Sequence, residues 1–270
     1  MQALSTYVPE GSDIYYVLRQ VPAAKKTPYL ALHAFAFELY KISAHYQELS
    51  IAQQKLAWWF EEIKRMYQNQ ATHPITQSLY DFIAVYDLKE IELLAMIEAT
   101  VVATTTQIFA TTNELRQHYQ HTCGIVTGLK AKVLLPEAQN IIVMMHQLGV
   151  AAGILKHLLD FPKFLQRQHL YLPLSLFQAQ GIDPQPMLQG KDLERVKPLF
   201  QAEFITAKSI YIETKNKLSI KQQQLLKPLL LETLLLIKQV NKTANKGWQI
   251  FNYRLELSPL YKFFLTEFFR

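Results

Sequence analysis

Apolar residues recur every three or four positions along most of the chain, which is the spacing of amphipathic helices. The first clear run covers about residues 28–48 and follows Thr27-Pro28, a pair typical of a helix start. The same periodicity predicts helices at about 51–68, 75–86, 88–110, 113–133, 137–160, 191–218, 220–240 and 254–268. The segment 137–160 is apolar on several sides, so we expect it inside a bundle.

Breaks in this pattern fall mainly in one region. Phe161-Pro162 is expected to end the apolar helix, because the residue before a proline disfavours the helical conformation. Residues 163–190 are punctuated by proline and glycine, which predicts a loop with a short helix at 173–180. We find no internal repeat and no domain boundary. The sequence therefore predicts an all-α fold, with residues 1–270 forming a single helical bundle.

Composition agrees with a large helical core. Half of the residues are hydrophobic and 19% are charged, while 8 glycines and 12 prolines leave little turn chemistry for a many-stranded β-fold. The single cysteine, Cys123, excludes an intramolecular disulfide, and no zinc-ligand spacing is present. Met1–Glu10 lacks the features of a secretory signal. We therefore expect a protein that is cytoplasmic or peripheral to the inner membrane.

The net charge of +6 favours anionic partners such as diphosphates or lipid headgroups. No nucleic-acid-binding motif is present, so we expect no nucleic acid partner. Peripheral membrane contact has two candidate surfaces, the leucine-rich segment Lys215–Val240 and the aromatic segment Tyr261–Phe269. The simpler expectation is that both bury their apolar faces in the bundle.

Three segments carry a resemblance to a known family. They are Leu30–Ile42 (LALHAFAFELYKI), Lys55–Ile63 (KLAWWFEEI) followed by His73-Pro74, and Leu148–Pro173 (LGVAAGILKHLLDFPKFLQRQHLYLP). In this order and spacing they resemble the squalene/phytoene synthase family. The resemblance implies the isoprenoid synthase fold, a helical bundle with a central cavity. Within these segments we expect the tryptophans Trp58 and Trp59 to be core residues, and His73 to be a local cap or a surface residue rather than a catalyst.

Members of that family join two prenyl diphosphates head to head, a reaction in which Mg²⁺ held by aspartates neutralises the leaving diphosphate. Aligning the first motif through Ala34-Phe35 places its aspartate positions at Tyr40, Lys41 and Ala44, none of which is acidic. Aligning the second motif matches Asp160 with its first aspartate and Phe164 with its second. Asp160 is thus the one candidate for a metal-binding or catalytic residue.

The remaining candidates surround this position. No cofactor is expected, except Mg²⁺ if the protein is an active enzyme. The basic residues that the resemblance suggests for diphosphate binding are Lys41, Lys156 and Arg167. Candidate cavity-lining residues are Phe37, Glu38, Tyr40, Gly153, Phe164 and Tyr171. Lys156 and Asp160 are four positions apart on one helix face, so we expect them to pair.

The motifs that remain beside the missing carboxylates point to one branch of the family. The elements Ala34-Phe35 with Glu38-Leu39, and Phe161-Pro162 with Leu170–Pro173, resemble a divergent branch of the family. That branch includes relatives of a mitochondrial respiratory complex I assembly factor, and it retains the fold without the aspartate-rich motifs. The resemblance implies a protein that binds an isoprenoid, a lipid or a protein partner, with respiratory-complex assembly as one such role. The alternatives are a divergent, active prenyl-diphosphate transferase that uses Asp160, and a helical scaffold of another origin.

Overall fold

The computed structural model describes residues 2–46, 48–137, 139–252 and 255–269. Within these ranges the backbone forms helices joined by loops, and its one β-type pairing is a parallel bridge between Ile108 and Leu170. The all-α prediction is therefore confirmed. The principal helices are α1 (Asp13–Leu18), α2 (Lys26–His45), α3 (Leu49–Tyr67), α4 (Pro74–Tyr80), α5 (Glu90–Thr105), α6 (Thr112–Tyr119), α7 (Ile125–Leu134), α8 (Ile142–Leu165), α9 (Leu174–Ala179), α10 (Gln185–Leu188), α11 (Lys197–Lys217), α12 (Ile220–Leu225), α13 (Lys227–Ala244) and α14 (Pro259–Glu267).

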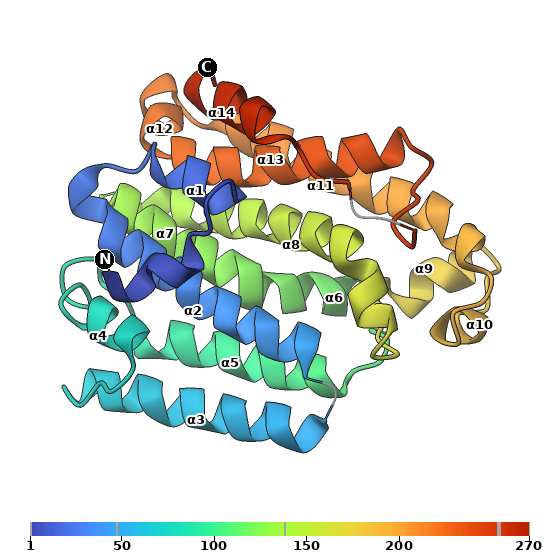
Figure 1. The fold of residues 1–270 in the computed structure, drawn as a ribbon, viewed down its shortest axis with the longest axis horizontal. Helices are drawn as coiled ribbons and strands as arrows, with labels where there is room; N and C mark the ends of the chain where they lie inside the picture. The colour runs from blue at the N-terminus through green and yellow to red at the C-terminus, as the bar shows by residue number, and fades with distance from the viewer. Residues whose placement is uncertain (1, 47, 138, 253–254, 270) are drawn as a thin grey trace.

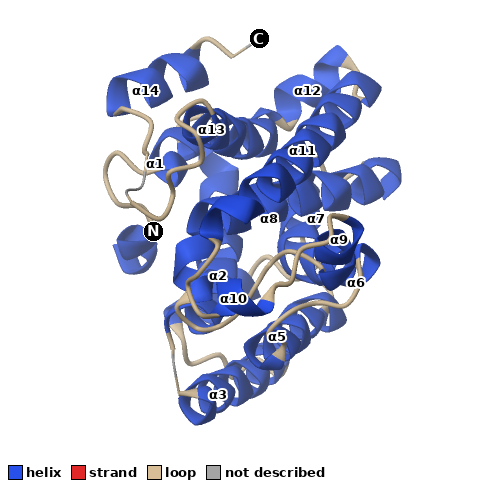
Figure 2. Cartoon of the chain, turned by 90° about the vertical axis from the view of Figure 1, so that its right-hand side faces the viewer, coloured by secondary structure: helices blue, strands red, loops and turns tan. Residues whose placement is uncertain are grey.

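The long helices pack in successive layers. At one edge α3 lies against α5, and α2 lies between this pair and α7 (Figure 1). The opposite side is built by α11 and α13, which both pack on α8, while α14 lies outermost against α1 (Figure 2). The centre of the bundle is therefore occupied by α2, α7 and α8.

Helix α8 is strongly apolar and lies inside the bundle, as expected. Among the described segments it is the one helix with the length and hydropathy of a membrane span, and 61% of that window is buried by the rest of the protein. A buried core helix meets the same criteria of length and hydropathy, so this observation is weak support for a span.

The prediction that Phe161-Pro162 ends this helix is wrong, because α8 continues to Leu165. A proline inside a helix removes one N–H donor and strains one turn, but here it lies in the last turn, where few hydrogen bonds depend on it. The carbonyl of Pro162 still accepts from the amide of Gln166 at 3.2 Å. The extra turn keeps Asp160 and Phe164 on one helix.

Several other predicted boundaries differ from the observed ones; for example, the predicted helix 88–110 ends at Thr105 and the predicted helix 191–218 begins at Lys197. The predicted helix 75–86 ends at Tyr80. The predicted helix 220–240 is divided at Leu226, and Pro228 lies in the first turn of the α13 that follows. The predicted helix 113–133 is interrupted by a π-helical turn, Gln120–Gly124. Two predicted boundaries touch residues outside the described ranges, near 47 and at 254.

The π-helical turn packs directly against α8. A Cβ added at Gly149 of α8 would lie 2.3 Å from the carbonyl oxygen of Cys123 and 2.6 Å from the Cα of Gly124. Backbone therefore contacts backbone at this crossing, and no side chain larger than hydrogen fits at position 149. This contact fixes α6 and α7 against the central helix.

The aromatic segment of α3 differs in part from expectation. Trp59 is buried against Phe35, whereas Trp58 is 43% exposed, so the core prediction holds for the first and is wrong for the second. The two are neighbours on a helix, so they face different directions. His73 is the predicted cap, since its Nδ1 accepts from the amide of Ile75 at 3.2 Å and α4 begins at the next residue.

Next to these tryptophans, the fully buried carboxylate of Glu62 fixes the loop before α4. It accepts from the amides of Thr72 and His73 at 2.7 and 2.8 Å and from the hydroxyls of Thr72 and Thr76 at 2.7 and 2.6 Å. Arg65 pairs with it at 2.7 Å. Burial alone would raise the pKa of Glu62, but these hydrogen bonds outweigh it and lower the pKa to about 2.

Replacing Glu62 by glutamine is expected to lower the free energy of unfolding by about 3 kcal/mol, because buried donors lose their acceptor. The stabilisation should be complete above the ordinary pKa of 4.5 and should fall as pH drops toward about 2, since the folded pKa is the lower one. Urea denaturation at several pH values measures both effects. Glu61→Gln, at an exposed carboxylate on the same helix, is the matched control and should change stability little.

Candidate functional site

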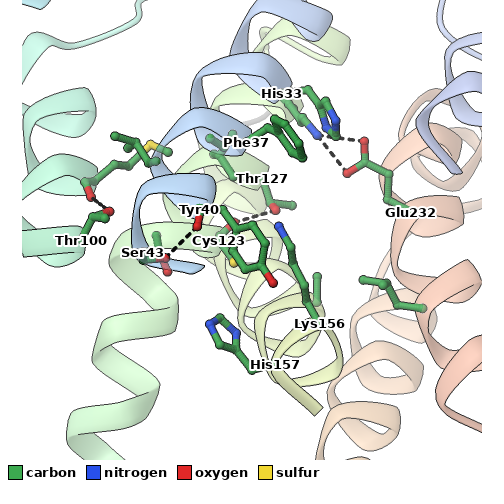
Figure 3. A pocket seen from close by; sticks show the side chains of 18 of the residues that line it. His33, Phe37, Tyr40, Ser43, Thr100, Cys123, Thr127, Lys156, His157 and Glu232 are labelled. Carbon is green, nitrogen blue, oxygen red and sulfur yellow. Dashed lines mark hydrogen bonds and ion pairs between the residues drawn. The ribbon is translucent and has the colours of Figure 1, made fainter. Parts of the chain in front are cut away.

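A cavity of about 250 Å³ lies at the centre of the bundle between α2, α5, α7, α8 and α13. Its wall is mainly apolar, and its polar residues come from facing helices (Figure 3). The residues most relevant to its chemistry are His33, Phe37, Tyr40, Lys130, Lys156 and Glu232. The helical spacing of positions 33, 37 and 40 places three of them on one face of α2.

Two carboxylates line this cavity, and each is paired. Glu232 of α13 forms an ion pair with Lys130 of α7 at 2.8 Å and accepts from the hydroxyl of Tyr29 at 2.8 Å. Asp13 pairs with Lys262 of α14 at 2.7 Å. Charge pairing of this kind lets ionised groups remain in a mostly apolar wall.

Lys156 of α8 reaches into the cavity beside Tyr40 (Figure 3). Its Nζ lies 3.3 Å from the centroid of the Tyr40 ring, a cation–π contact. The predicted pairing of Lys156 with Asp160 is wrong: no ion pair joins them. Burial lowers the pKa of Lys156, while the nearby Cys123 and Asp160 act in the opposite direction.

Asp160 is buried and its carboxylate is engaged on both oxygens. The hydroxyl of Tyr40 donates to Oδ2, and Lys163 pairs with Oδ1 at 2.9 Å. Lys163 follows Asp160 by three positions, so both side chains lie on the same face of α8. Asp160 therefore pairs with the lysine three positions later, and not with Lys156 four positions earlier as the sequence suggested.

An aromatic cluster backs the cavity wall around His157. The imidazole lies 4.0 Å from the ring of Tyr171 and 4.8 Å from that of Phe164, centroid to centroid. Its Nδ1–H donates to the carbonyl of Gly153 at 2.8 Å. Burial lowers the pKa of His157 to about 3 and that of the neighbouring His118 to about 4. Both imidazoles are therefore neutral at pH 7.

The structure places the predicted site residues in two groups. Phe37, Tyr40 and Lys156 line the cavity, and the other predicted residues are not among the described residues of its wall. Those outside the wall are Glu38, Lys41, Gly153, Asp160, Phe164, Arg167 and Tyr171.

The positions of this second group follow from their contacts. Lys41 pairs with Glu38 at 3.2 Å, and the hydroxyl of Tyr7 donates to the same carboxylate. A Cβ at Gly153 would lie 3.0 Å from the ring of Tyr119, so this glycine packs behind the wall. Arg167 is half-buried after the end of α8, where burial lowers its pKa.

Comparison with known proteins then decides the family. The sequence profile of squalene/phytoene synthase matches residues 9–261, nearly the whole chain. The chain belongs to the squalene/phytoene synthase family. A search of curated proteins finds no significant match.

Solved structures share the fold of this family member at low sequence identity. A dehydrosqualene synthase in complex with ligand superposes with a TM-score of 0.81 at 15% identity, covering 98% of this chain and 93% of that one. Squalene synthase HpnC from Alicyclobacillus acidocaldarius gives 0.76 at 16% identity, over 92% and 94% of the two chains. YisP from Bacillus subtilis subsp. subtilis strain 168 gives 0.69 at 14% identity, over 98% and 92%. The predicted isoprenoid synthase fold is confirmed.

Chemistry in the squalene/phytoene synthase family implies Mg²⁺, so the donor set must be tested against this ion. Mg²⁺ requires several oxygen ligands in octahedral geometry. Within the described ranges no group of three or more His, Cys, Asp or Glu side chains is placed to hold a metal. Asp160, the surviving acidic position, is committed to Tyr40 and Lys163. The residues present do not fit the ion.

Sequence reasoning missed several residues of this family member's cavity, notably His33, Cys123, Lys130 and Glu232. A usable signal existed for two of them. Lys130 and Glu232 each stand in an otherwise apolar helical stretch, where an ionised residue is costly unless a partner pairs with it. Their pairing across 102 positions could not be read from periodicity.

The buried histidines predict a pH-dependent stability. Their folded pKa values lie below the ordinary 6.5, so stability should be complete above pH 6.5 and fall as pH decreases toward their folded values. Each contributes up to about 1.4 kcal/mol per pH unit in that range. Denaturation at pH 7.5 and pH 5 measures the slope. His157→Phe keeps the ring in the aromatic cluster and should reduce the slope, and an unchanged slope would contradict this assignment.

Proposed function

We propose that this member of the squalene/phytoene synthase family acts by binding an isoprenoid or lipid in its central cavity, without metal-dependent condensation. The observation that carries the proposal is the hydrogen bond from Tyr40 to Asp160. Tyr40 stands where the sequence alignment expects an aspartate, and its hydroxyl occupies the carboxylate that remains. In this proposal, the hydrogen bond engages the carboxylate that the expected metal ion would need as a ligand.

The cavity supports a binding role. Its volume, about 250 Å³, is slightly below the range of about 300–1,000 Å³ that is usual for small-molecule pockets. Apolar side chains such as Phe37, Met96 and Val126 line it, which suits an extended hydrocarbon chain. The resemblance to complex I assembly factors gives a second form of the proposal, in which the retained fold binds a protein partner.

An active, divergent prenyl-diphosphate transferase is the alternative function. One observation favours it, since Lys156 brings a cation to the cavity wall, where a diphosphate would need neutralisation. The ion pair of Lys41 with Glu38 and the position of Arg167 outside the cavity wall count against it. Neither residue supplies the further charge that an allylic diphosphate requires.

Two assays on the purified protein test the choice. With farnesyl or geranylgeranyl diphosphate and Mg²⁺ it should form no squalene or phytoene, because the donor set does not fit the metal. Isothermal titration with farnesol should nevertheless show saturable binding. Ala152 lines the cavity on α8, and Ala152→Phe should weaken the binding at least about tenfold by filling the space.

The controls for these assays are direct. A known squalene synthase in the same buffer must yield product, and thermal melting must show that Ala152→Phe remains folded. Formation of either hydrocarbon by this protein would contradict the proposal. Loss of that product in Asp160→Asn would then establish the alternative function.

The outermost helix suggests where an apolar ligand would arrive. The side chains of Leu260, Tyr261 and Phe264 on α14, and of Phe268 directly after it, are exposed. The expectation that this segment is buried therefore fails for these side chains. The same helix carries Lys262, whose partner Asp13 lines the cavity. We include in the proposal that this aromatic face rests on a membrane surface.

A flotation assay with anionic phospholipid vesicles measures this contact. The protein should float with the vesicles, and the double variant Phe264→Ser/Phe268→Ser should remain in the soluble fraction because it loses the apolar face of α14. Ile91→Ser, at an exposed apolar residue of α5, is the matched control and should still float. Equal flotation of all three proteins, or of none, would contradict membrane contact through α14.

A further inference from the structure

The charged side chains that the structure describes around the cavity form ion pairs, with the exception of Lys156. Asp13 is neutralised by Lys262, and Glu232 by Lys130. Asp160 lies behind the wall and pairs with Lys163. Among the charged residues that the structure describes along the wall, Lys156 alone has no ion-pair partner within hydrogen-bond range.

The titratable neighbours of Lys156 do not supply a compensating charge. Burial raises the pKa of the Cys123 thiol, which keeps it neutral. Burial and the two lysines Lys130 and Lys156 hold the pKa of His33 well below its usual range, so this imidazole is neutral as well. His118 and His157 are neutral for the same reason of burial. The described part of the wall therefore carries one uncompensated positive charge.

The hydroxyl groups of the wall are committed as donors. Ser43 donates to the carbonyl of Tyr40 at 2.9 Å, Thr100 to that of Met96 at 2.8 Å, and Thr127 to that of Cys123 at 2.7 Å. Figure 3 shows these bonds turned toward the helix backbone rather than toward the open space. The ammonium of Lys156 has three N–H donors, and its contact among the described side chains is with the face of the Tyr40 ring. It is the donor best placed for a ligand.

We propose that the cavity binds a monoanionic amphiphile, a carboxylate with a hydrocarbon tail, whose head group accepts hydrogen bonds from Lys156. This rests on the proposed binding function and specifies its ligand. A single carboxylate matches the one uncompensated charge and replaces the water that the ammonium loses on burial. A diphosphate carries at least two negative charges, and the described residues of this wall offer it neither a second free cation nor a metal site.

Three ligands with one tail and different head groups test this inference. Farnesoic acid, farnesol and farnesyl diphosphate are titrated into the full chain by calorimetry in a buffer with EDTA. Farnesoic acid should bind at least about tenfold more tightly than either other ligand, because it alone gains one charge-assisted hydrogen bond without excess charge. A linear fatty acid of similar length, used in parallel, separates an isoprenoid acid from a fatty acid as the source of the carboxylate.

The variants show whether Lys156 is responsible. Lys156→Met should abolish the preference for the acid over the alcohol, and Lys156→Arg should retain part of it. Lys64→Met, at an exposed lysine of α3, is the matched control and should leave the preference intact.

Each outcome decides one of the two proposals. Equal affinity for acid and alcohol, a preference that survives Lys156→Met, or tightest binding of the diphosphate would overturn the inference while leaving the binding function in place. Absence of binding by all ligands would overturn both. If Lys156→Met does not fold, the arginine variant decides, since a complete loss of the preference there would show that charge at this position is not what selects the acid.

Discussion

The close packing of α8 against the π-helical turn is the constraint on which the rest of the bundle depends. At Gly149 the two backbones meet with no room for a Cβ, and one turn later a Cβ at Gly153 would lie 3.0 Å from the ring of Tyr119. A π turn adds one residue to a helical turn and so rotates the side chains that follow it. Here this rotation joins α6 to α7 along the central helix, and it places Cys123 in the cavity wall.

The polar interior is organised around pairs that neutralise each other. Lys130 pairs with Glu232 between α7 and α13, and Lys262 pairs with Asp13 between α14 and α1. Lys163 pairs with Asp160 within α8. Each of these described carboxylates is therefore paired with a lysine ammonium group. The substitution at Tyr40 acts twice, because it removes one expected carboxylate and hydrogen-bonds the one that survives.

The fold could be predicted from sequence because helical periodicity is a local signal that many residues share. The sequence motifs also made the family predictable, because residues such as Ala34-Phe35 and Tyr171–Pro173 mainly build the bundle and are retained with the fold. Features that depend on a few contacts could not be predicted in this way. Pro162 reads as a helix stop in isolation, yet it is tolerated in the last turn of α8. The neighbours Trp58 and Trp59 look alike in sequence, and their burial depends on the rotation of α3.

The candidate site was the least predictable part for the same reason. Lys156 has a suitable partner four positions away, and the competing Lys163 is only three positions from that partner. The choice between the two lysines depends on Tyr40, which lies on α2. The ammonium of Lys156 packs over the Tyr40 ring, and Lys163 pairs with the carboxylate of Asp160. Sequence spacing gives the set of allowed pairs, and tertiary packing chooses among them.

The ion pair between Asp13 and Lys262 has a consequence for how the chain folds. These residues are 249 positions apart, yet together they hold α14 against α1 beside the cavity. A contact of such long range forms late, because the loop that it closes carries a large entropic cost. During synthesis the core around α8 can assemble well before Lys262 has left the ribosome. We therefore expect this side of the cavity to be closed late in folding, after the core around α8 has formed.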